Sequence, residues 1–230
     1  MVDHSIIDES SGASAGVGGS RGSVLLPRGT QVLLLDVGGV IAPDASPAQS
    51  VVVEQRLSLP AGTLYPLLYG GEPWKALSTG RLDEATFWRD VAAAAGLDAA
   101  DLREAMTPLW GWHQLDEAVL ALMRIARRRV RVAILTNATL DWETFLHESG
   151  IRNLADPIIN SAREGLRKPD PASFGHALEL LDLPPEAVLF VDDKPRNTAV
   201  ARELGIDSLD YTTVEALAEA LRARGILPPR

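Results

Sequence analysis

Short apolar runs that end in polar residues are the feature that most restricts how this 230-residue chain can fold. The first run, QVLLLDV at residues 31–37, is unbroken and rich in branched side chains. Such a run is typical of a strand that is buried on both faces of a parallel sheet. Similar runs recur at residues 130–137, 156–161, 187–193 and, more weakly, 206–212. These segments predict a parallel sheet.

Helical segments separate the later runs. They are LDWETFLHESG (140–150), DPASFGHALELL (170–181), NTAVARELG (197–205) and VEALAEALRARG (214–225). Asp170 is a suitable N-cap for the second of them, and Pro171 suits its first helical position. Strands that alternate with helices in this way predict a doubly wound, Rossmann-like α/β sheet with right-handed crossovers.

More than 90 residues lie between the first and second runs, far beyond an ordinary crossover connection. The apolar residues of this segment recur with helical spacing, which predicts an all-helical insertion. We expect an α/β core at residues 29–43 and 113–230 and a helical cap at residues 44–112. Residues 1–28 are rich in Gly, Ser and Ala, which predicts a disordered tail.

Composition excludes several functions. The chain has no cysteine, so it has neither disulfides nor thiolate metal ligands, and we expect a cytoplasmic protein. The formal charge of −9 disfavours nucleic acid as a partner, because binding to a phosphate backbone needs clustered Lys and Arg. No apolar run approaches the roughly 20 residues that cross a bilayer, and the N-terminus lacks the pattern of a secretory signal.

The carboxyl ends of the expected strands carry polar side chains, at the edge where doubly wound sheets bind ligands. These side chains, together with one lysine from the loop after the third run, are Asp36, Thr136, Asn137, Lys168, Asp192 and Asp193. Carboxylate oxygens suit Mg²⁺, which binds through one or two carboxylates and keeps waters for a substrate phosphate. A carboxylate is also a usable nucleophile at phosphorus. The set therefore favours phosphoryl transfer.

Four motifs, LDVGGVI, LTN, RKPDP and FVDD, resemble the signature motifs of the haloacid dehalogenase (HAD) superfamily of hydrolases, in the same order. The resemblance covers nearly the whole chain from Gln31 and includes a helical cap inserted after the first motif. The cap segment WKALSTGRLDEATFW resembles the small-molecule phosphatases of the superfamily, including sugar-phosphate phosphatases and the phosphatase domain of soluble epoxide hydrolases. The resemblance implies a Mg²⁺-dependent phosphomonoesterase that forms an aspartyl-phosphate and acts on a small phosphorylated metabolite.

The resemblance also implies a role for each site residue. The metal ligands would be Asp36, the backbone carbonyl oxygen of Gly38, Asp193 and, in a supporting position, Asp192. Asp36 would also be the nucleophile. Thr136 and Lys168 would hold the phosphoryl group. Apart from the resemblance, we expect Asn137, which follows Thr136, to shape the turn that presents this hydroxyl and to line the substrate site with Thr136 and Lys168.

One position departs from the family pattern. Most phosphatases of the family carry Asp two residues after the nucleophile, as general acid for the leaving group and base for the hydrolytic water. Here that position is Gly38. General acid–base assistance contributes about a hundred- to ten-thousand-fold, so the glycine puts turnover in question. His113 near the end of the cap is one candidate for a replacement proton donor.

Three alternatives stay open at this point. Dehalogenases of the superfamily have no second Asp, but they usually lack the acidic pair Asp192 and Asp193. Relatives that cleave C–P bonds carry a small residue at this place and use a cap lysine, and Lys75 is the lysine of this cap. The third alternative is a catalytically impaired protein that binds phosphorylated ligands or a protein partner.

Overall fold

The computed structural model describes residues 29–44, 46–106 and 114–229. Within this part of the chain, one parallel sheet has the strand order β3-β2-β1-β4-β5. The strands are β1 (Val32–Leu35), β2 (Arg131–Thr136), β3 (Ile158–Asn160), β4 (Val188–Asp192) and β5 (Asp207–Asp210). The doubly wound α/β class predicted from the apolar runs is confirmed.

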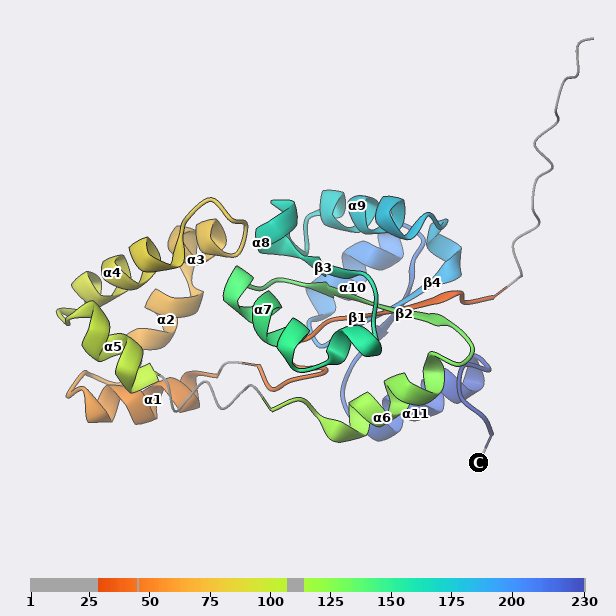
Figure 1. Cartoon of the computed structure of the whole chain (residues 1–230), viewed down its shortest axis with the longest axis horizontal. Helices are drawn as coiled ribbons and strands as arrows, with labels where there is room; N and C mark the ends of the chain where they lie inside the picture. Colours follow the sequence, from red (N-terminus) through yellow and green to blue (C-terminus); the bar gives the residue numbers. More distant parts are fainter. Residues whose placement is uncertain (1–28, 45, 107–113, 230) are drawn as a thin grey trace, which may run out of the picture.

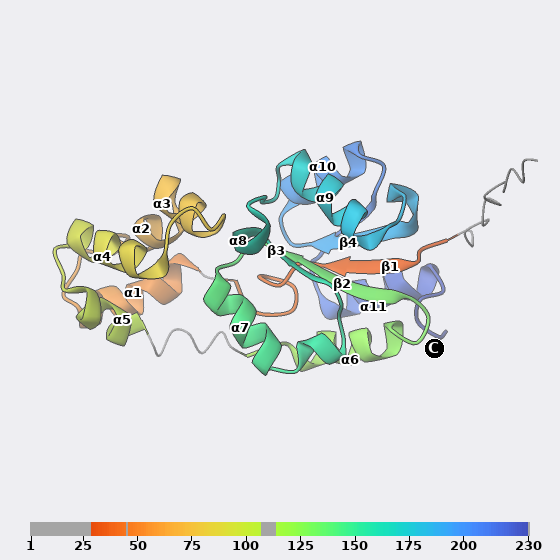
Figure 2. The same ribbon diagram turned by 45° about the horizontal axis from the view of Figure 1, so that its top comes forward.

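Side chains of β1 alternate between the two faces of the sheet, and each face has its own apolar core. Leu33 and Leu35 pack against one set of helices, whereas Val32 and Leu34 pack against another. The first set is α6 (Glu117–Ala126), α7 (Leu140–Glu148) and α11 (Val214–Ala223), and the second is α9 (Pro171–Leu181) and α10 (Pro195–Glu203). Figure 2 shows the sheet between these two layers. Burial on both faces explains why the β1 sequence is uniformly apolar.

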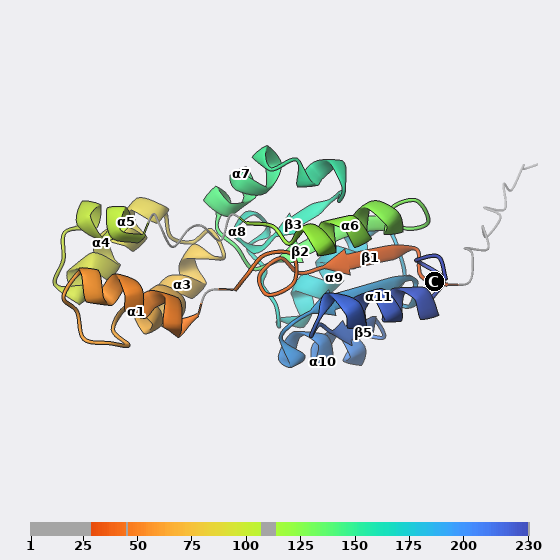
Figure 3. The same ribbon diagram turned by 90° about the horizontal axis from the view of Figure 1, so that it is seen from below.

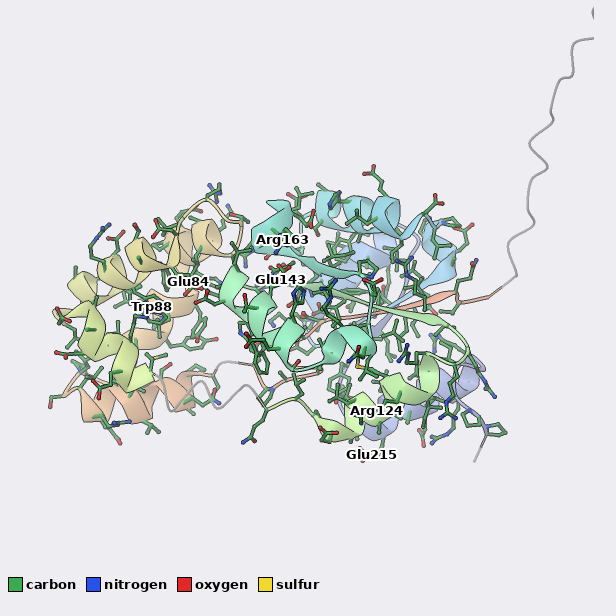
Figure 4. All side chains as sticks on the ribbon, viewed as in Figure 1. Glu84, Trp88, Arg124, Glu143, Arg163 and Glu215 are labelled. Carbon is green, nitrogen blue, oxygen red and sulfur yellow. The ribbon has the colours of Figure 1, made fainter. Side chains whose placement is uncertain are left out.

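Short elements complete the core. They are the 3₁₀ helices η2 (Ile151–Asn153) and η3 (Pro185–Ala187) and the helix α8 (Ser161–Glu164). Arg163 of α8 forms an ion pair of 2.7 Å with Glu143 of α7, and both residues are labelled in Figure 4. This pair joins the two elements that follow β2 and β3.

The insertion between β1 and β2 is helical, as its periodicity predicts. Its helices are α1 (Pro47–Arg56), α2 (Leu64–Tyr69), α3 (Gly71–Leu77), α4 (Glu84–Ala95) and α5 (Ala99–Met106). They pack around a separate apolar core and lie beyond the carboxyl ends of the strands (Figures 1 and 3). The predicted boundary at residue 113, and His113 itself, fall outside the described residues.

Local signals in the sequence explain where several of these helices begin and end. Ser46 and Gln49 form a capping box at the start of α1, and Asp83 accepts a hydrogen bond of 2.8 Å from the backbone N–H of Thr86 at the start of α4. Gly96 ends α4 with a left-handed conformation. Where the cap meets the core, Gly80 lies so close to the carbonyl oxygen of Ala162 that a Cβ would collide with it.

None of the helices in the described ranges combines the length and the apolar character that crossing a bilayer requires.

Candidate active site

Asp36 lies directly after β1, buried at the carboxyl edge of the sheet. Its backbone N–H bonds the carbonyl oxygen of Val191 at 2.9 Å, which continues the pairing with β4. The backbone N–H of Val37 donates to Asp36 Oδ1 at 2.7 Å. The chain then turns back, because the N–H groups of Ile41 and Ala42 both bond the Val37 carbonyl oxygen, at 2.8 and 2.9 Å. This turn holds the Asp36 side chain in place.

Lys168 joins two carboxylates inside the protein. Its Nζ lies 2.9 Å from Asp36 Oδ1 and 2.6 Å from Asp192 Oδ2, and its side chain is only 1% exposed. Asn137 fixes the lysine backbone: its Nδ2 donates to the Lys168 carbonyl oxygen at 2.8 Å, and its Oδ1 accepts from the Lys168 N–H at 2.9 Å. The structure thus places Asn137 as a support for Lys168, on the wall of the same cavity as Thr136.

Asp192 ends β4, and its carboxylate accepts several hydrogen bonds at this site. The Asn197 Nδ2 donates to both Asp192 oxygens, at 2.9 and 3.0 Å, and the backbone N–H of Lys194 donates to Oδ1 at 2.9 Å. Asp193 is less buried. One carboxylate oxygen from each of Asp36, Asp192 and Asp193 lies within 4.8 Å of the others. Three converging carboxylate oxygens are the donor set expected for a hard divalent cation.

Burial and neighbouring charges shift these carboxyl groups in opposite directions. Burial, with a smaller contribution from the Asp192 charge, raises the pKa of Asp36 to about 7, although the Lys168 charge opposes the shift. Burial also acts to raise the pKa of Asp192, but the Lys168 ammonium and several hydrogen bonds outweigh it, so the net pKa is lowered. Burial raises the pKa of Asp193, and Lys194 opposes this. The surroundings of Asp192 therefore favour its ionised form, and a cation beside Asp36 would favour the ionised form of Asp36.

The two glycines after Asp36 have different structural causes. Gly39 has a φ of +78°, and a Cβ there would collide with the Asp193 carboxylate, so a side chain at this position would be both strained and crowded. Gly38 has ordinary backbone geometry, but a Cβ there would lie 3.2 Å from Asp44 Oδ1. The Asp44 carboxylate therefore lies beside the space that a side chain at position 38 would enter. Lys194 Nζ lies 2.9 Å from Asp44 Oδ2.

A cavity of about 440 Å³ opens from Asp36 toward the cap. Core residues Asp36, Gly38, Thr136 and Asn137 line it, as the sequence predicts for one sheet edge. Several other lining residues were not singled out from the sequence, among them Asp44, Arg167, Lys194, Arg196, Trp142 and the cap residues Tyr65, Tyr69, Glu72 and Trp74. The sequence signal for the three basic residues was their place in the motifs: Arg167 is the first residue of RKPDP, and Lys194 and Arg196 closely follow FVDD.

Lys75, the cap lysine, also lines this cavity. Its side chain is 51% exposed and pairs with Glu72 at 3.4 Å. The lysine thus reaches the cavity while half of its surface stays in solvent.

A parallel sheet that gathers carboxylates and a buried lysine at its carboxyl edge, beneath an inserted helical cap, defines a class of hydrolase. A family model described as haloacid dehalogenase-like hydrolase matches residues 30–205. The chain therefore belongs to the haloacid dehalogenase-like hydrolases, as its four motifs indicate.

Individual relatives are distant. A part of acyl-CoA dehydrogenase family member 10 of Mus musculus is 27% identical, covering 90% of this chain but 20% of the mouse protein. A sesquiterpene phosphatase of Aspergillus oryzae is 26% identical, covering 84% of this chain and 95% of that protein. A magnesium complex of a HAD-family enzyme from Bacteroides thetaiotaomicron aligns with a TM-score of 0.68 at 20% identity, covering 84% of this chain and 99% of the other. At this identity the structural match shows the shared fold.

Proposed function

We propose that the protein is a Mg²⁺-dependent phosphomonoesterase that forms a phosphoaspartate on Asp36 and acts on a small phosphorylated molecule. The observation that carries this proposal is the convergence of three carboxylates within 4.8 Å, with Lys168 inserted between two of them. The Aspergillus relative is named a phosphatase, and the match covers 95% of its length, which supports the same reaction class. The acidic trio also argues against a dehalogenase, because halide displacement needs no divalent cation.

The donor set fits a divalent metal ion. Asp36, Asp193, Asp192 and the backbone carbonyl oxygen of Gly38 would hold it, because oxygen ligands are those that Mg²⁺ prefers. When bound, Mg²⁺ supplies positive charge that favours ionised Asp36 and neutralises the phosphoryl oxygens.

The bonds around Asp36 select the attacking atom. Oδ1 accepts from the Val37 N–H and contacts Lys168, so Oδ2 is the oxygen that attacks phosphorus. The bond from phosphorus to the ester oxygen breaks, while Lys168 and Thr136 bind phosphoryl oxygens. Water then attacks the phosphoaspartate, releases inorganic phosphate and restores Asp36.

The leaving oxygen needs a proton, and we assign its delivery to Asp44. This carboxylate lines the same cavity as Asp36 and lies beside the position where most relatives carry their acid–base aspartate. Lys194 contacts Asp44 at 2.9 Å and holds it there. The same carboxylate then accepts a proton from the hydrolytic water. We thus assign to Asp44 the role for which His113, which lies outside the described residues, is the candidate from the sequence.

The experiment is a phosphate-release assay with an activated aryl phosphate and a panel of phosphorylated metabolites, each with Mg²⁺ and with a chelator. We expect Mg²⁺-dependent release that falls to background in Asp36→Asn and persists in Asp90→Asn, an exposed cap carboxylate that serves as the matched control. Absence of release combined with saturable, Mg²⁺-dependent phosphate binding would overturn the enzymatic proposal in favour of a binding protein.

A further inference from the structure

A second cavity, of about 310 Å³, lies between the cap and α7. Its lining consists of Leu68, Tyr69, Trp74, Leu77, Glu84, Phe87, Trp88, Thr139, Asp141 and Trp142, of which seven are aromatic or aliphatic. Tyr69, Trp74 and Trp142 also line the cavity that opens from Asp36. The two cavities therefore adjoin at these three residues, so the second cavity lies next to the space that a substrate with its phosphate at Asp36 would occupy.

Aromatic rings give this wall a fixed shape. Tyr69 and Trp74 meet edge to face with centroids 5.4 Å apart, and Phe87 and Trp88 meet in the same way at 5.5 Å. Trp74 links the two pairs, with its ring centroid 6.4 Å from that of Phe87. The rings also belong to or pack against the apolar core of the cap. A wall anchored in this way is preformed, which reduces the ordering cost of binding.

The polar lining residues are acidic or neutral. Glu84 lies on the side of the cap nearest α7 (Figure 4), and burial together with Asp141 raises its pKa. Thr139 is the third polar residue, and no lysine or arginine is among the described residues that line this cavity. A second anionic group would therefore find no counter-charge here. A polyhydroxyl group would leave most of its hydroxyls without partners, which is unfavourable in an apolar site.

We propose that the substrate carries an apolar hydrocarbon or aromatic group on its phosphate, and that this group binds in the second cavity. The inference rests on the proposed phosphatase activity and names the substrate class of that activity. The cavity is concave and mostly apolar, and it adjoins the cavity at Asp36, which is the form that specificity pockets take.

The test is the kcat/KM of a series of n-alkyl phosphates from ethyl to decyl, measured with Mg²⁺ below the micelle concentration. Burial of each methylene is worth about 0.8 kcal/mol, so we expect kcat/KM to rise about twofold to fourfold per methylene until the cavity is filled. A decyl phosphate with a terminal carboxylate should lose most of this gain. Equal kcat/KM for ethyl and decyl phosphate would overturn the proposal.

Two variants test whether the gain in kcat/KM with chain length arises in the second cavity. Leu77→Trp narrows the cavity and should reduce the decyl-to-ethyl ratio of kcat/KM by at least tenfold. Leu180→Trp makes the same substitution at an exposed position on α9 and should retain the ratio. If Leu77→Trp fails to fold, the dependence of kcat/KM on chain length in the wild-type protein still tests the proposal.

Binding of 1-decanol, measured by calorimetry, separates this proposal from the activity on which it rests. Saturable binding of decanol without hydrolysis of any ester would leave the apolar site standing and refute the phosphatase. Hydrolysis of esters without chain-length dependence and without decanol binding would support the phosphatase and refute the apolar site.

Discussion

Moving the acid–base carboxylate between positions 44 and 38 tests how the leaving group receives its proton. Asp44→Asn removes the proton donor but keeps the shape of the side chain. Gly38→Asp with Asp44→Ala places a carboxylate where most relatives of the family carry it. A Cβ at position 38 would lie 3.2 Å from Asp44 Oδ1, so the two carboxylates compete for one space. Gly38→Asp alone should therefore impair the protein, whereas the double variant should not.

The expected losses in rate and stability can be estimated for each variant. Loss of general acid assistance lowers the rate by about a hundred- to ten-thousand-fold, or about 3 to 5 kcal/mol of barrier, on alkyl phosphates. An activated aryl phosphate, whose leaving group is stable without a proton, should lose less than about tenfold. In Gly38→Asp, two carboxylates about 4 Å apart repel by roughly 1 to 4 kcal/mol, depending on solvent exposure.

The assay compares kcat/KM across phosphate esters with leaving groups of graded acidity. We expect a steeper dependence on leaving-group acidity in Asp44→Asn than in the wild type, restoration in the Gly38→Asp/Asp44→Ala variant, and no change in the control Asp90→Asn. A purely structural role for Asp44, for example in holding Lys194, would lower all esters equally. An equal loss across the series, or a failure of the double variant to recover, would refute the assignment.

Three further predictions concern stability. Lys168→Met leaves Asp36 and a second buried carboxylate without their shared cation, so the free energy of unfolding in urea should fall by about 3 to 5 kcal/mol, and a loss below about 1 kcal/mol would contradict the contacts described. Folding raises the pKa of Glu84, so the wild-type protein loses stability as pH rises above the unfolded pKa of this carboxyl. The free energy of unfolding of Glu84→Gln relative to the wild type should therefore increase from pH 4 to pH 7. A difference between the two proteins that is the same at both pH values would count against this. Gly39→Ala should be more destabilising than Gly62→Ala, since both glycines have a positive φ costing about 1 to 2 kcal/mol but only the first meets a neighbouring side chain. Thermal unfolding of the two variants provides the comparison.

The sheet was predictable because its strands are short and buried on both faces. An unbroken apolar run such as 32–35 has few other stable environments, and the polar residue after it marks the carboxyl edge. The weakest strand, β5, has exposed or half-buried residues throughout, which is why its pattern is thin. The cap was predictable as helical from periodicity, but no local pattern specifies which of its side chains face the core.

The candidate site was most predictable where a polar residue ends a strand or directly follows one. Thr136 and Asp192 end their strands and Asp36 directly follows β1, so the sheet itself brings them together. Asp44 is not: it reaches the site because the chain turns back on Val37 after β1. Its sequence position, six residues after Gly38, carries no such signal. If Asp44 has the role that we propose, a carboxylate absent from its usual sequence position is supplied by a residue that the fold brings to the same place.

Charge is divided unevenly between the two cavities, and this division orients an amphiphilic ester. Arg167, Lys194 and Arg196 line the cavity at Asp36, whereas the residues described around the second cavity include acids but no basic side chain. An alkyl phosphate that entered with its phosphate toward α4 would place an anion beside Glu84 and leave its hydrocarbon among cations. The reverse orientation satisfies both ends, because the phosphate meets the cations and the chain meets the aromatic rings. Charge at one end and apolar contact at the other are therefore enough to hold such a substrate in the productive direction.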